Sequence, residues 1–165
     1  MLSQGTTFGA GQAMTLKNTV GLPEKAPRFH CTVAARPVAA RVARHLVCDC
    51  FAGRLSVDVV ADVGLVMTEL VANAVAAMGE SGSVEFAAWI AGGDVVVLVI
   101  DQAAGEPKPQ HEDASSEAGR GLFLVAELTR DWGWSPFPDG KAVWGFIGGG
   151  ADIRSPSPDG ASTPS

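Results

Sequence analysis

The sequence contains no tyrosine and only three cysteines among its 165 residues. A small, odd number of cysteines does not supply a disulfide framework, and it favours a reducing compartment, so we expect a cytoplasmic protein. Cys48 and Cys50 are separated by a single residue and have no second Cys or His pair, which argues against a zinc site. Residues 1–20 lack the basic cluster followed by an apolar stretch that a secretory signal requires.

Positive charge is also scarce. The chain has 12 Lys and Arg against 18 Asp and Glu, and no basic residue lies between Arg54 and Lys108, where eight acidic residues lie. A net charge of −6 argues against binding to nucleic acid through phosphate contacts. No uninterrupted apolar run approaches the roughly 20 residues of a membrane helix, so we expect no membrane span.

Hydrophobic residues make up 47% of the chain, which is enough to build a core. Gly, Ser, Thr and Pro are concentrated at both ends, where periodic apolar positions are few. This composition predicts flexible tails over residues 1–26 and 148–165, and one domain over residues 27–147.

Apolar periodicity and turn residues predict the secondary structure of the domain. The expected order is a strand over 28–33, a helix over 37–51, a helix over 57–78, strands over 83–91 and 94–100, a polar loop over 102–118, a helix over 119–130, and strands over 132–137 and 141–147. In the first helix, we expect Val38, Val42, Val47 (or Leu46) and Cys50 to form the apolar stripe. This order predicts an α+β two-layer sandwich, with a mixed, mostly antiparallel sheet and helices on one face.

The second predicted helix is apolar nearly all round, with Thr68, Glu69 and Asn73 as its strongly polar residues between 63 and 78. Such a helix is buried, and Glu69 and Asn73 lie four residues apart, so they project from the same face. A carboxylate and an amide placed together can hold a divalent ion or orient a nucleophile. On spacing alone, the two residues equally fit the narrow solvent face of an ordinary amphipathic helix.

Two further positions carry possible chemistry. Asp101 ends a continuous apolar strand, where a carboxylate can accept a hydrogen bond from a ligand amine or simply terminate the strand. Gly119-Arg120-Gly121-Leu122 follows the polar loop and begins a helix, whose free N–H groups suit a phosphate. The alternative interpretation is that this segment is simply the start of a helix, with no ligand.

Taken in order, these segments resemble the histidine-kinase-like ATP-binding domains of sensor kinases and gyrase. Among them, the chain is most similar to the stand-alone bacterial anti-sigma factor serine kinases. The matching segments are ELVANAV from Glu69, VIDQAAG ending at Gly105, GRGLFLV from Gly119, and the WGW and GKAVW segments of the last two strands. The resemblance spans residues 28–147 and implies the Bergerat ATP-binding fold.

The resemblance implies that ATP and Mg²⁺ are the cofactors. Asn73 then corresponds to the Mg²⁺ ligand, Glu69 to the general base, and Asp101 to the acceptor of the adenine amino group. The lid over the nucleotide corresponds to the segment that contains Gly105, Lys108, Gly119, Arg120, Gly121 and Leu122. In this lid the glycines are hinges, and the backbone at Gly121 and Leu122 lies at the phosphates.

Four residues, at three places in the sequence, depart from the family pattern. Ala103 replaces a glycine, Ala142 replaces a threonine whose hydroxyl supports the adenine contact, and Ala76 and Ala77 stand where a basic residue and His are common. The resemblance implies an ATP-binding regulatory protein that phosphorylates a Ser on an antagonist protein, or sequesters a sigma factor, and that forms homodimers. The alternative is a degenerate, non-catalytic protein-binding module of the same fold.

Overall fold

The computed structural model describes residues 29–107, 121–137 and 139–148. Its elements are β1 (Phe29–Ala34), α2 (Ala39–Phe51), α3 (Val57–Met78), β2 (Ser83–Ala91), β3 (Asp94–Asp101), α4 (Gly121–Leu128), β4 (Asp131–Phe137) and β5 (Gly140–Gly148). The order predicted from the sequence is confirmed, with bounds that differ by at most two residues. The predicted tails lie outside the described residues, apart from Gly148, as does the part of the polar loop after residue 107.

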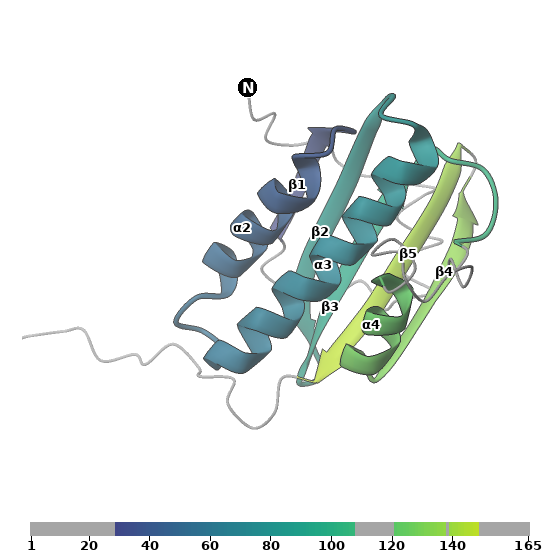
Figure 1. The fold of residues 1–165 in the computed structure, drawn as a ribbon. Helices are drawn as coiled ribbons and strands as arrows, with labels where there is room; N and C mark the ends of the chain where they lie inside the picture. Colours follow the sequence, from purple (N-terminus) through teal and green to yellow (C-terminus); the bar gives the residue numbers. More distant parts are fainter. Residues whose placement is uncertain (1–28, 108–120, 138, 149–165) are drawn as a thin grey trace, which may run out of the picture.

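The five strands form one sheet in the order β1-β2-β3-β5-β4. Figure 1 shows α2, α3 and α4 together on one face of this sheet, which confirms the predicted α+β architecture. The expectation of a mixed sheet is wrong for the described residues, because all four strand pairings are antiparallel. The reason is that the β4–β5 hairpin adds to the sheet through β5, which runs antiparallel to β3.

Helix α3 is the central element of the helical layer. Ser56 caps its N-terminus, since the Ser56 Oγ accepts the Val59 N–H at 3.3 Å, and Gly79 ends it at a left-handed φ of 60°. By length and a mean hydropathy of 1.7, α3 is apolar enough to cross a membrane. In this fold its apolar side chains instead pack on α2, α4 and the sheet.

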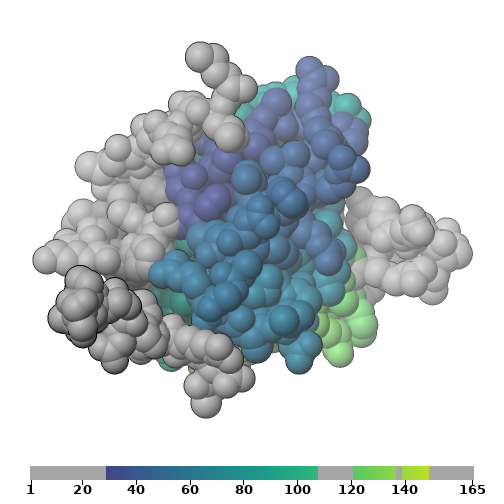
Figure 2. All heavy atoms as spheres, turned by 90° about the vertical axis from the view of Figure 1, so that its left-hand side faces the viewer, coloured from purple at the N-terminus to yellow at the C-terminus, as the bar shows by residue number. Residues whose placement is uncertain are grey.

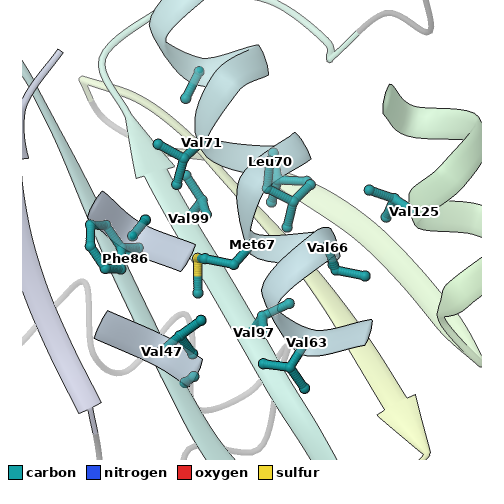
Figure 3. Packing of buried hydrophobic residues seen from close by; sticks show 14 of the residues in the cluster. Val47, Val63, Val66, Met67, Leu70, Val71, Phe86, Val97, Val99 and Val125 are labelled. Atoms are coloured by element: carbon teal, nitrogen blue, oxygen red, sulfur yellow. The ribbon is translucent and has the colours of Figure 1, made fainter. Parts of the chain in front are cut away.

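The main core lies between α3 and the sheet. Figure 3 shows Met67, Leu70 and Val71 of α3 beside side chains of β2 and β3, namely Phe86, Val97 and Val99. Val47 of α2 and Val125 of α4 join the same cluster from either side of α3, and both are fully buried. The burial of α3 on three sides explains why its sequence is apolar nearly all round.

Of the stripe predicted for helix α2, Val47 is fully buried, but the other buried positions differ from the prediction. The buried residues are Ala39, Ala43, Val47 and Phe51, which repeat every four positions, whereas Val38 is 53% exposed. The small side chains at the first two of these positions permit close packing of α2. Val38 precedes the first helical residue, and it lies outside this packed face.

The contact between α2 and α3 is close at Gly64. A Cβ atom on this residue would lie 2.6 Å from the Cys48 Sγ, and the Cys48 thiol donates to the Val60 carbonyl at 3.6 Å. Burial raises the pKa of the Cys48 thiol, which keeps it neutral. Figure 2 views the molecule from the α2 side and shows the atoms of α2 and α3 packed together.

The opposite face of the sheet carries a second apolar cluster. Its buried members are Ala87, Trp89, Val96, Leu98 and Ala142, with Ile100, Trp144 and Phe146 packed against them. These residues alternate along β2, β3 and β5 with those of the main core. No helix of the described part of the chain contributes to this cluster.

We expect Gly64→Ala to lower the free energy of unfolding by about 1–3 kcal/mol, because the added methyl group overpacks the α2–α3 contact. In a Cys48→Ala background the same substitution is expected to be neutral or to stabilise, since alanine is the better helix residue by about 0.5–1 kcal/mol. Urea denaturation of the natural chain, the two single variants and the double variant measures both effects. Equal destabilisation in both backgrounds would show that Cys48 is not the reason for glycine at this position.

Candidate functional site

A cavity of about 390 Å³ lies beside the C-terminal half of α3. It is lined by Asn73, Ala76, Ala77, Ala104, Gly105, Glu106, Pro107 and Lys141. Three separate parts of the chain therefore form its wall: α3, the segment after β3, and the beginning of β5. Its volume is in the range of small-molecule sites. A second hollow, of about 460 Å³, is lined by Pro37, α3 and the residues that follow it, and it contains none of the predicted site residues.

A buried ion pair joins β3 to β5 next to the cavity. Asp101 and Lys141 are register partners, and the Lys141 Nζ lies 2.9 Å from the Asp101 Oδ1. The two side chains are only 1% and 3% exposed. The Ala103 N–H donates to the same carboxylate oxygen at 2.8 Å, and the Lys141 Nζ donates to the Ala103 carbonyl at 3.4 Å. These hydrogen bonds satisfy charges that would otherwise be costly to bury.

The close approach of the two strands depends on Gly140. A Cβ atom on this residue would lie 1.8 Å from the carbonyl oxygen of Asp101. Only glycine therefore lets β5 begin directly against the end of β3. Neither Gly140 nor Lys141 was identified as functional from the sequence.

Ala142 does not belong to the cavity, contrary to expectation. Its side chain is fully buried in the cluster on the opposite face of the sheet, while its neighbour Lys141 lines the cavity. Because successive residues of a strand point to opposite faces, the two cannot both face the ligand. A missing hydroxyl at Ala142 therefore removes no contact from this site. The register of Asp101 with Lys141 is the signal that identifies the residue facing the cavity.

The replacement of glycine by Ala103 causes no backbone strain. Among the described residues other than glycine, only Glu80 has a positive φ, so Ala103 occupies a backbone conformation open to any residue. Gly105, in contrast, has a φ of 94°, a conformation that favours glycine. Of these two positions, only Gly105 needs glycine for the backbone of this cavity wall.

Glu69 and Asn73 lie one helical turn apart, about 6 Å along the axis of α3. Asn73 lines the cavity, whereas Glu69 packs against the first residue of α4. A Cβ atom on Gly121 would lie 2.6 Å from the Glu69 Oε2, so the carboxylate occupies the space that a side chain at Gly121 would take. Leu122 follows and is buried in the main core. The predicted pair is thus divided between the cavity and the adjacent α3–α4 contact.

Burial raises the pKa of the Glu69 carboxyl above its ordinary value of 4.5. The physical cause is desolvation, which disfavours the charged form of a half-buried acid. A carboxylate with a raised pKa is a stronger base than one in free solvent.

The remaining predicted residues include Lys108, Gly119 and Arg120, which lie outside the described part of the chain. Within the described ranges, no group of three or more His, Cys, Asp and Glu side chains could hold a metal ion. A magnesium ion at Asn73 would thus take most of its oxygen ligands from a bound phosphate and from water, as is usual for this ion.

Comparison with known families supports the same fold. The family model of the histidine kinase-like ATPase domain matches residues 33–144, which is more than half of the chain. The protein therefore belongs to the histidine kinase-like ATPase family. The matched range includes the cavity, the Asp101–Lys141 pair and Glu69. No curated protein matches the chain.

We expect Lys141→Met to lower the free energy of unfolding by about 3–5 kcal/mol, because it leaves the buried Asp101 charge without its partner. The double variant Lys141→Met/Asp101→Asn should recover most of this loss, since it removes both charges and keeps an acceptor for the Ala103 N–H. Arg130→Met, which breaks the exposed pair with Asp94, is the control and should change stability by less than about 1 kcal/mol. Equal instability of the single and double variants, measured by urea denaturation, would contradict this explanation.

Glu69→Gln is expected to raise the melting temperature at pH 7.5. The folded protein binds a proton at Glu69 more tightly than the unfolded chain does, so the ionised carboxylate destabilises the fold above its raised pKa. The gain should shrink as the pH falls through the raised pKa toward 4.5, and it should be absent well below 4.5, where the carboxyl is protonated in both states. Scanning calorimetry across this pH range measures the difference, with the exposed Glu127→Gln variant as control. A gain independent of pH would contradict the role of burial.

Proposed function

We propose that this protein binds Mg-ATP in the cavity beside Asn73 and acts as an anti-sigma factor serine kinase, which phosphorylates a Ser on an antagonist protein. The observation that carries the proposal is the convergence of Asn73, Gly105 and Lys141 at one cavity, with Asp101 paired to Lys141 directly beside it. Membership of the histidine kinase-like ATPase family supports the nucleotide. The similarity to anti-sigma factor kinases in sequence supports the partners, a sigma factor or its antagonist, and a cytoplasmic homodimer.

The residues of the cavity fit this ligand. The Asn73 side-chain oxygen is a suitable ligand for Mg²⁺, and the ion supplies charge neutralisation at the phosphates when bound. Asp101 accepts the adenine amino group, and Gly105 allows the backbone to turn at the wall of the cavity. Ala76 and Ala77 leave the neighbouring wall without charge, so the described part of the cavity has Lys141 as its one cation.

Glu69 acts as the general base of the transfer. Its carboxylate takes the proton of the acceptor Ser hydroxyl while the Ser Oγ forms a bond to the γ-phosphorus of ATP. The bond between the γ-phosphorus and the bridging oxygen breaks, and ADP leaves. Because Glu69 must be ionised, the rate of transfer falls with decreasing pH through the raised pKa of this residue.

Thermal unfolding with and without Mg-ATP tests the binding site. At a hundredfold excess over the dissociation constant, a ligand of the native state stabilises by about 2.7 kcal/mol, so we expect a rise of several degrees. Asn73→Ala should lose this rise, whereas Arg41→Ala, an exposed change on α2, should keep it. No rise at millimolar Mg-ATP would contradict the proposal and favour the non-catalytic binding module.

A phosphotransfer assay tests the reaction. The chain is incubated with γ-³²P-labelled ATP and purified antagonist proteins from the same genome, and the labelled residue is identified by mass spectrometry. Glu69→Gln should keep the thermal shift and partner binding but lose transfer by about 10²–10⁴-fold, the usual contribution of a general base. Undiminished transfer in Glu69→Gln would show that another group takes the proton.

A further inference from the structure

We infer that Lys141 determines recognition of the nucleotide base. Asp101 accepts a hydrogen bond from the amino group of the base, and the Lys141 ammonium group donates a hydrogen bond to the ring nitrogen next to that amino group. The inference rests on the proposed function, since it assigns a contact within the same cavity. Lys141 then acts as a specificity-determining residue as well as a partner of a buried charge.

The first observation concerns the free side of the Asp101 carboxylate. Its Oδ1 accepts two hydrogen bonds, from the Lys141 Nζ at 2.9 Å and the Ala103 N–H at 2.8 Å, which use both lone pairs of that oxygen. Its Oδ2 accepts none from the described residues. The Asp101 side chain is only 1% exposed, and it is held beside the cavity by Lys141, which lines it. The Asp101 Oδ2 thus has no donor among the described residues and can accept a hydrogen bond from a ligand.

The second observation concerns the donors of Lys141. An ammonium group has three N–H donors, and the described residues supply two acceptors, the Asp101 Oδ1 and the Ala103 carbonyl. Lys141 lines the cavity while its side chain is only 3% exposed. The third donor of this nearly dehydrated charge therefore has its natural acceptor in a molecule bound in the cavity.

Together the two groups form an adjacent acceptor and donor. Asp101 and Lys141 are paired across neighbouring strands, on the side of the sheet covered by α3. This arrangement complements a ring edge on which an amino group adjoins an unprotonated ring nitrogen, as in adenine. A ligand that keeps the amino group but lacks the ring nitrogen satisfies Asp101 and leaves Lys141 without its acceptor.

Isothermal titration calorimetry of the full chain with three Mg-nucleotides tests the inference. The ligands are ATP, 1-deaza-ATP, which lacks the ring nitrogen, and purine riboside triphosphate, which lacks the amino group. We expect both analogues to bind the natural chain about tenfold more weakly than ATP, the typical effect of losing a hydrogen bond to a charged group. The double variant Lys141→Met/Asp101→Leu, which avoids an unpaired buried charge and introduces no new donor, should bind ATP and 1-deaza-ATP equally.

Arg130→Met provides the matched control, since it removes a cation outside the cavity and should keep the preference for ATP. Two results would overturn the inference while leaving the proposed function intact. One is equal binding of ATP and 1-deaza-ATP by the natural chain. The other is tighter binding of ATP by the double variant, which would mean that Lys141 obstructs the base. Failure of the natural chain to bind ATP at all would overturn the proposed function itself, and the inference with it.

Discussion

The burial of α3 on three sides is the constraint on which the rest of the structure depends. The sheet covers one side of this helix, and α2 and α4 cover its flanks. Glycines set both flanking contacts, because Gly64 admits the Cys48 sulfur and Gly121 admits the Glu69 carboxylate. Glu69 lies on the side of α3 where α4 approaches it, Asn73 lies where the segment after β3 approaches it, and the cavity lies beside Asn73.

The second organising interaction is the pairing of β3 with β5. It places Asp101 opposite Lys141 at the end of the sheet where the cavity opens, and Gly140 allows the two backbones to meet. The cost of burying both charges is offset by their hydrogen bonds to each other and to Ala103. The same strands position an apolar cluster on the opposite face, where Ala142 lies. A one-residue change of register would exchange these two faces.

Local signals in the sequence were sufficient to predict the elements of the fold. Ser56 and Gly79 delimit α3, and Gly92-Gly93 forms the β2–β3 turn with the positive φ angles that such hairpins require. Spacing also placed Glu69 and Asn73 on one side of α3. Spacing could not predict that Asn73 lines the cavity while Glu69 packs against α4, because the position of Gly121 beside Glu69 is set by tertiary packing. Lys141 was missed for a similar reason, since its side of β5 is defined by pairing with β3.

The central claim is that the cavity beside Asn73 binds Mg-ATP. Amide chemical shifts of the ¹⁵N-labelled protein, recorded during titration with Mg-ATP, test it most directly. The account predicts saturable shifts concentrated at Asn73, Ala76, Ala104, Gly105 and Lys141, with little change along α2. Shifts confined to another surface, or none at millimolar Mg-ATP, would contradict it.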